Sequence, residues 1–168
     1  MGYETYVDEV RNQLRSEGFE EVESIEDDRF TNTLAKREKG LKVGMLNMMA
    51  TVVDAEGLRS GDLRVYTDDF RELLGDESYA KFGVGENMFG YVVFAVANPD
   101  DELLDWYEGY DVRTRNSHVF PLIYDLEAEK VHTHSVPKLK GRRLFKKQKK
   151  DAEDFFDLSD SSSGGLLG

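Results

Sequence analysis

The stretch Asn87-Met88-Phe89-Gly90-Tyr91-Val92-Val93-Phe94-Ala95-Val96-Ala97 is the most apolar part of this 168-residue chain. A short continuous apolar run with little alternation is typical of a strand that is covered on both faces. The stretch therefore predicts a buried strand inside the sheet of the protein.

Helices and strands are predicted on both sides of this strand. Before it, the residue pattern predicts a helix from Tyr3 to a stop at Gly18, three strands at 19–25, 30–38 and 41–54, and a helix from Ser60 to Gly75. After it, we expect a helix opened by Asn98-Pro99, two strands at 117–126 and 131–135, and a helix at 142–156. Gly44 and Asn47 suggest a bulge or a split in the 41–54 strand.

The order of these elements predicts the fold class. The strand–helix–strand–helix–strand passage in the middle of the chain requires right-handed crossovers and some parallel pairing. We predict an α/β fold, bordering on α+β, with a mixed sheet of five or six strands flanked by helices. Pro121 predicts an edge position or a bulge in its strand, because proline cannot donate a ladder hydrogen bond.

Length and composition bound the organisation of the chain. We expect a single domain over residues 1–156 and a disordered acidic Ser/Gly tail over 157–168. The sequence has no cysteine, which excludes disulfides and thiolate metal sites. Neither a membrane-spanning apolar run nor a signal-peptide pattern is present, so we expect a soluble, cytoplasmic protein with no membrane partner.

The charge balance is strongly acidic. The formal net charge is −12, from 34 acidic and 22 basic side chains. Such an excess keeps a protein hydrated in concentrated salt but causes self-repulsion when salt is low. We therefore expect adaptation to high salt; an ordinary acidic protein from a low-salt cell is the alternative.

The order helix, three strands, helix, strand over residues 3–97 resembles the core of the PD-(D/E)XK nuclease-like superfamily. That resemblance rests on topology alone. It implies an acid near the second strand and an acid-x-Lys motif on the third, which together hold magnesium beside the scissile phosphate. Here the third strand reads Val43-Gly44-Met45-Leu46-Asn47-Met48-Met49-Ala50-Thr51-Val52-Val53, with no acid before Asp54 and no lysine after it. The fold is therefore expected without the family's catalytic residues.

The pair His132 and His134 lies on one face of a predicted strand, because side chains alternate along a strand. If Ala128-Glu129 forms the turn, Asp125 lies opposite His132. Two imidazoles and a carboxylate suit zinc or iron. The alternative is a pair of surface or half-buried histidines, one of which pairs with Asp125.

The segment from Lys138 to Lys150 is unlike the rest of the chain. It holds eight bases in thirteen residues and no acid: Lys138, Lys140, Arg142, Arg143, Lys146, Lys147, Lys149 and Lys150. We call it the basic segment. Such a cluster is typical of contact with nucleic-acid phosphates or an acidic protein. Alternatively, the segment docks on acidic parts of its own chain or is a solvated helix face.

These observations favour a non-enzymatic binding or adaptor protein that uses the basic segment. The alternative is a metal-dependent hydrolase or a nuclease-like protein. No cofactor, catalytic residue or oligomeric state is predicted.

Overall fold

The computed structural model describes residues 1–40, 44–82, 87–110 and 117–158. Within these ranges it describes all side chains except those of residues 38–40, 44–45, 76–82, 87 and 117.

The described residues form one mixed sheet whose strand order follows the sequence. Its strands are β1 (Glu20–Glu21), β2 (Thr33–Gly40), β3 (Gly44–Asp54), β4 (Asn87–Val96), β5 (Ser117–Asp125) and β6 (Lys130–His132). Strands β3, β4 and β5 are parallel, and the pairs β1–β2, β2–β3 and β5–β6 are antiparallel. The predicted mixed α/β sheet with parallel pairing in the middle is therefore confirmed, with six strands.

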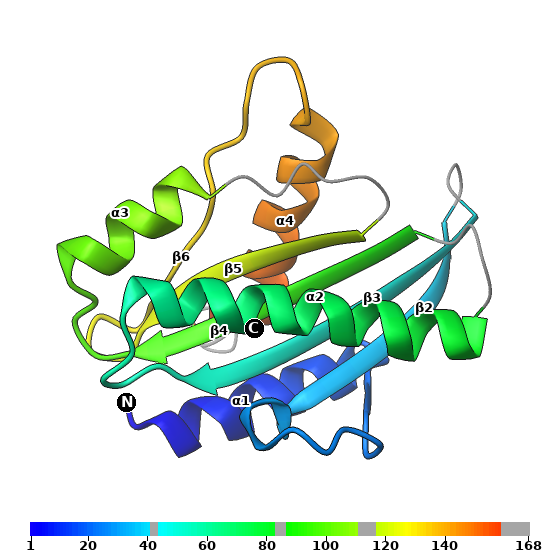
Figure 1. The fold of residues 1–168 in the computed structure, drawn as a ribbon, viewed down its shortest axis with the longest axis horizontal. Coiled ribbons are helices and arrows are strands. Elements are labelled where there is room, and N and C mark those ends of the chain that lie inside the picture. Colours follow the sequence, from blue (N-terminus) through cyan, green and yellow to red (C-terminus); the bar gives the residue numbers. More distant parts are fainter. Residues whose placement is uncertain (41–43, 83–86, 111–116, 159–168) are drawn as a thin grey trace, which may run out of the picture.

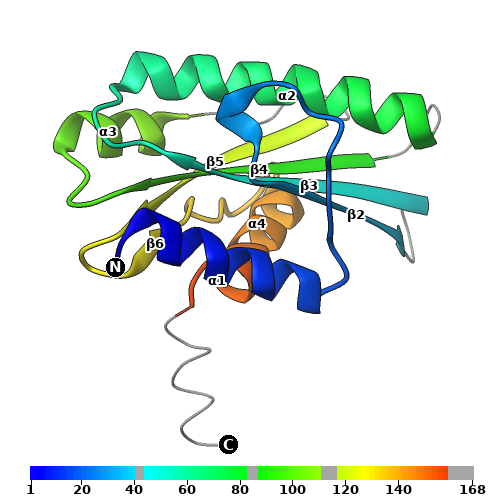
Figure 2. The same cartoon turned by 90° about the horizontal axis from the view of Figure 1, so that it is seen from below.

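Helices cover both faces of the sheet. Figures 1 and 2 show α1 (Tyr3–Ser16) and α4 (Arg142–Phe155) on one face, and α2 (Ser60–Phe82) and α3 (Asp101–Gly109) on the other. A short 3₁₀ helix, Asp28–Phe30, precedes β2. The first and last helices thus lie on the same side of the sheet, although they are far apart in the sequence.

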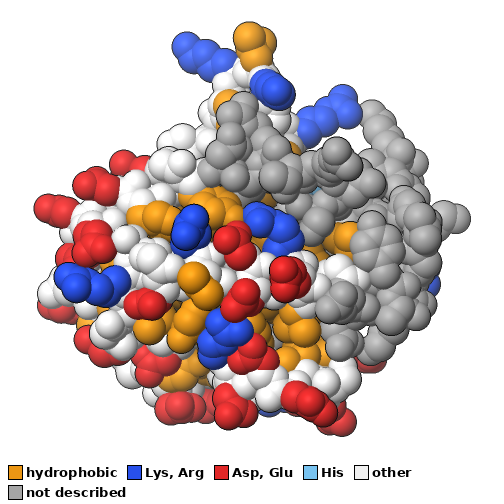
Figure 3. Space-filling view, viewed as in Figure 1, with side chains coloured by type: hydrophobic (Ala, Val, Ile, Leu, Met, Phe, Trp, Pro, Cys, Tyr) orange, Lys and Arg blue, Asp and Glu red, His pale blue; other side chains and the backbone are white. Residues whose placement is uncertain are grey.

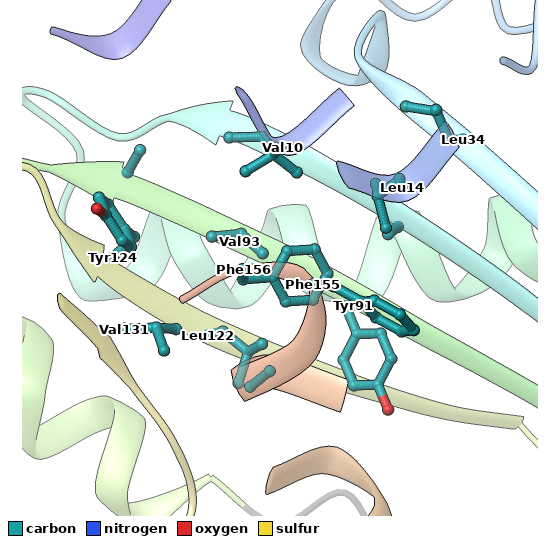
Figure 4. Close-up of a cluster of buried hydrophobic side chains, with 14 of the residues drawn as sticks. Val10, Leu14, Leu34, Tyr91, Val93, Leu122, Tyr124, Val131, Phe155 and Phe156 are labelled. Atoms are coloured by element: carbon teal, nitrogen blue, oxygen red, sulfur yellow. The ribbon is translucent and has the colours of Figure 1, made fainter. Parts of the chain in front are cut away.

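Strand β4 supplies the centre of two hydrophobic cores. Tyr91 and Val93 point toward α1 and α4, whereas Val92 and Phe94 point toward α2 and α3, and all four side chains are fully buried. Figure 4 shows the first of these clusters, with Phe155 and Phe156 from the end of α4 lying over the strands. This alternation confirms the prediction of a strand covered on both faces.

A glycine in β4 sets how closely α2 approaches the sheet. A Cβ atom at Gly90 would lie 3.1 Å from Val119 Cγ2, 3.3 Å from Leu74 Cδ2 and 3.3 Å from Phe70 Cε2. A larger residue would force these buried side chains to move.

Several details of the predicted elements are wrong. The strand predicted at 19–25 is limited to Glu20–Glu21, and the strand predicted at 131–135 ends at His132. Helix α2 continues through Gly75 to Phe82, because packing over the sheet outweighs the roughly 1 kcal/mol that an interior glycine costs. Helix α3 is capped by Asp100, whose Oδ1 accepts from the Leu103 N–H at 2.9 Å, and begins two residues after Pro99. Strand β3 runs unbroken from Gly44 with regular pairing on both sides, so neither a bulge nor a split occurs there.

The C-terminal end of the described chain packs against the sheet. Phe156 and Leu158 are both buried. Leu158 lies two residues beyond 156, where the domain was predicted to end. The remainder of the predicted tail, 159–168, lies outside the described residues.

The helix, three strands, helix and strand that suggested the nuclease-like resemblance follow one another as α1, β1, β2, β3, α2 and β4. The resemblance to that superfamily stays a prediction. Among the described residues, no helix combines the length and apolar character that crossing a bilayer requires.

Candidate binding surface

Helix α4 contains most of the basic segment. Its buried residues follow a helical spacing and form one buried face: Phe145, Gln148, Asp151, Ala152 and Phe155. The helix begins at Arg142, as predicted, and its bases lie on the remaining surface. The segment therefore packs through one face and presents its charges on the others.

Polar contacts fix α4 against the sheet. The Gln148 Nε2 donates to the carbonyl oxygen of His134 at 2.8 Å, and the Gln148 Oε1 accepts from the His134 N–H at 3.4 Å. Farther along the helix, the hydroxyl of Tyr91 on β4 donates to the Asp151 carboxylate at 2.5 Å. Lys147 contacts the same carboxylate oxygen at 3.0 Å. Burial raises the pKa of Asp151, and the nearby Lys147 ammonium opposes that rise.

Two of the eight bases are neutralised by neighbours one helical turn away. Lys147 pairs with Asp151, and Lys150 pairs with Asp154 at 2.7 Å. In the described part of the chain, no carboxylate pairs with the other six: Lys138, Lys140, Arg142, Arg143, Lys146 and Lys149. All six are exposed. The alternative that the segment docks on its own acidic body therefore does not hold for these six charges within the described residues.

Four of the six unpaired cations lie in or just before the first turn of α4, where the helix dipole is positive: Lys138, Lys140, Arg142 and Arg143. Arg142 and Arg143 are the first two residues of α4, and its first turn has no acid. Gly141 is the N-cap, with a left-handed φ of 82°, and it provides no side-chain cap. Cations at this end of a helix cost roughly 0.3–1 kcal/mol each. The sequence thus carries charges here that oppose helix stability.

A protruding loop precedes α4 and carries an exposed apolar residue. Leu139, between Lys138 and Lys140, has 87% of its surface exposed. The segment between β6 and α4 rises away from the sheet in Figure 1, and Figure 3 shows hydrophobic and basic side chains together at the top of the molecule, above a surface rich in acids. A buried leucine contributes a few kcal/mol to stability, and this side chain contributes none of it.

A cleft of about 410 Å³ runs along the side of α4. One wall carries Lys146, Lys147 and Lys150, and the other carries Lys36 from β2. Acids also line it, among them Glu17, Asp151 and Asp154. The cleft therefore extends the basic surface toward the sheet, but its acidic residues offset part of the positive charge.

The predicted pairing of the β5–β6 hairpin is wrong. Asp125 lies opposite Lys130, and His132 lies opposite Ile123. The cause is a turn of four residues, 126–129, rather than two, in which Glu129 adopts a left-handed φ of 54°.

The three predicted metal ligands have other contacts. The Asp125 Oδ1 accepts from the backbone N–H groups of Asn98, Glu127 and Ala128 at 2.9–3.2 Å. Burial tends to raise the pKa of Asp125, but these three donors outweigh it and lower the pKa. His132 is half-buried, and burial lowers its pKa. In the ranges that the structure describes, no three His, Asp or Glu side chains are gathered closely enough to hold a metal ion.

His134 is buried, with 5% of its surface exposed. Its Nε2 lies 2.8 Å from the carbonyl oxygen of Pro121, and a carbonyl can only accept, so Nε2 carries a proton. Burial lowers the pKa of His134 to about 4, and the Pro121 carbonyl only partly opposes this. On one side of β5, Pro121 lies opposite Val92 of β4, and on the other side β6 pairs only with residues 123–125, so β5 is locally an edge at Pro121, as predicted.

Sequence reasoning missed Leu139 and Gln148. Leu139 was overlooked because it stands between two lysines. A leucine that fits neither a helical nor a strand pattern of apolar residues is itself a sign of exposure. Gln148 can be placed on the buried face only once Phe145 and Ala152 fix which side of the helix faces the sheet.

No protein-family model matches the chain, and no curated protein or solved structure is significantly similar to it.

Proposed function

We propose that this protein is a non-enzymatic binding protein whose basic segment docks onto a polyanionic partner. The observation that carries the proposal is the set of six exposed cations that no described carboxylate neutralises. They are concentrated in one short segment of a chain with a net charge of −12. An anionic partner would find one attractive region on a body that otherwise repels it.

The position of these cations supports the proposal. Arg142 and Arg143 lie where a helix favours anions, so a phosphate or carboxylate of the partner would relieve the unfavourable arrangement. Arg142 Nη1 donates to the carbonyl oxygen of Pro137 at 3.3 Å, which is a hydrogen bond to a neutral group and not an ion pair. Local arrangements that oppose stability are common at functional sites.

We further propose that the protein works in the cytoplasm of a cell that accumulates salt. The acid excess outside the basic segment supports this: residues 1–130 carry 29 acidic and 14 basic side chains. Electrostatic binding weakens steeply with salt, so such a partner must also make contacts that salt does not screen. Leu139 offers one such contact.

The test is a binding titration with three labelled polyanions: a single-stranded oligonucleotide, a duplex and polyglutamate. At about 0.1 M salt we expect wild-type protein to bind at least one of them, with an affinity that falls linearly in log–log form as salt rises. The variant Lys146→Glu/Lys149→Glu should lose most of this affinity.

A matched control separates position from net charge. Arg64→Glu/Lys130→Glu changes the total charge equally at two exposed cations outside the basic segment. Equal losses in both variants, or no binding of any polyanion by the wild type, would refute the proposal.

A further inference from the structure

A second cleft lies at the root of the protruding loop, between the end of α3 and the start of α4. Its volume is about 350 Å³, and it is lined by Glu108, Gly109, Tyr110, Ser135, Pro137, Lys140 and Phe145. We call it the α3–α4 cleft. It contains Lys140, so it borders directly on the unpaired cations of the basic segment.

An aromatic residue, Tyr110, lines the α3–α4 cleft, and its side chain is held in position. The half-buried Tyr110 packs against Trp106, with ring centroids 5.3 Å apart. Its hydroxyl accepts a hydrogen bond from Arg71 Nη2 at 2.7 Å, which ties the ring to α2. Because the ring is held from two sides, it is ready for a stacking contact without further ordering.

The other apolar surfaces of the cleft are Pro137 and Phe145, the latter with 9% of its surface exposed. Ser135 adds an exposed hydroxyl that both donates and accepts hydrogen bonds. Lys140 supplies a cation, whereas Glu108 supplies a negative charge. The cleft therefore suits a ligand that has a flat apolar group and an attached anion. The apolar group would contact the aromatic and proline side chains, and the anion would lie near Lys140 and away from Glu108.

This combination matches the chemistry by which proteins hold single-stranded nucleic acid, where bases stack on aromatic side chains and cations follow the phosphates. A duplex keeps its bases stacked inside and cannot place one in the cleft. Stacking is also a contact that salt does not screen, unlike the ion pairs of the basic segment.

We propose that the α3–α4 cleft binds one base of a single-stranded nucleic acid, stacked on Tyr110, while the neighbouring phosphates lie on Lys138, Lys140, Arg142 and Arg143. This inference rests on the proposed function, since it names the partner of the same basic segment.

The tryptophan of the chain provides a direct readout. Trp106 is the one tryptophan in the sequence and packs against Tyr110, so its fluorescence reports on the cleft. Full-length protein is titrated at low salt with an oligothymidylate, an oligouridylate, a duplex and an abasic phosphodiester strand of equal length. The abasic strand carries the charges without bases, and the first two strands distinguish DNA from RNA.

We expect at least one of the two base-bearing single strands to change Trp106 fluorescence and to bind at least tenfold more tightly than the abasic strand. Tyr110→Ala should remove that difference while the affinity for the abasic strand is unchanged. Tyr110→Phe keeps the ring and should retain the preference, although it loses the hydrogen bond from Arg71. Circular dichroism and thermal melting of each variant establish that it is folded.

The two proposals fail separately. Equal affinity for abasic and base-bearing strands, without a change in Trp106 fluorescence, would overturn the base site and leave the basic segment as a binding surface. Binding of polyglutamate in preference to every nucleic acid would also overturn the base site. Absence of binding to any polyanion at low salt would overturn both.

Discussion

Gln148 and His134 are joined by two hydrogen bonds through the carboxamide of Gln148, which bonds to both the N–H and the carbonyl oxygen of His134. Strand β6 ends two residues earlier, at His132. The Gln148 side chain therefore supplies the hydrogen-bond partners that a neighbouring strand would otherwise give to the backbone of His134. The contact lies between the edge of the sheet and the helix that carries the basic segment. The position of the basic segment therefore depends on this buried pair.

Replacing Gln148 should destabilise the protein. Gln148→Ala leaves the buried N–H and carbonyl of His134 without a partner, and a lost buried hydrogen-bond partner costs about 1–3 kcal/mol. Lys149→Ala, at the exposed neighbour, should change stability by less than about 0.5 kcal/mol. Urea denaturation of the two variants measures both values. Equal, small effects would show that the pair is not important for stability.

The protein should become less stable as the pH is lowered from 6.5 to about 4, because of His134. The pKa of its imidazole is lowered from 6.5 to about 4, so the unfolded chain binds the proton more readily than the folded one. Stability is therefore full above pH 6.5 and decreases as the pH falls toward 4, by about 3 kcal/mol at most. The half-buried His132, whose pKa is also lowered, shifts stability in the same direction.

The contribution of His134 is isolated by comparing the wild type with His134→Gln, which keeps a side-chain donor for the Pro121 carbonyl. Denaturation at several pH values between 4 and 7 should give a flatter profile for the variant. Parallel profiles would mean that His134 does not titrate as its burial implies.

Hydrophobic patterning was sufficient to predict the central part of the fold. The apolar run of β4 identified a strand covered on both faces, and the residue pattern from Tyr3 to Gly18 identified α1. Both patterns follow from burial: in α1 the buried residues Tyr6, Val10 and Leu14 recur at helical spacing. Helix α2 was predicted to end at Gly75 because a local propensity near 1 kcal/mol was given more weight than packing, which the sequence does not display.

The candidate site was predictable only in part. Charge density alone located the basic segment, but which of its bases are neutralised depends on positions one turn away, as with Lys147 and Asp151. The histidine prediction failed in its register, since the length of a hairpin turn is set by backbone conformation at residues such as Glu129. The α3–α4 cleft joins residues separated by more than thirty positions along the chain, from Glu108 to Phe145, and no local pattern brings them together.

Stability should rise with salt concentration. The net charge of −12 produces repulsion across the surface, and raising potassium chloride from about 0.1 M to molar levels shortens the screening length from about 10 Å to about 3 Å. We therefore expect the melting temperature to increase over this range. A melting temperature that is constant or decreases would contradict adaptation to high salt.

The central claim is that the unpaired cations at the start of α4 are kept for binding at a cost in stability, and Arg142→Glu/Arg143→Glu tests it most directly. Acids in the first turn of a helix are favourable, so the variant should unfold at a higher urea concentration, with a gain of roughly 0.3–1 kcal/mol per residue. Polyanion binding, measured in parallel by anisotropy at about 0.1 M salt, should be lost. A variant that is more stable and no longer binds would support the account. One that binds as well as the wild type, or that loses stability at every salt concentration, would contradict it.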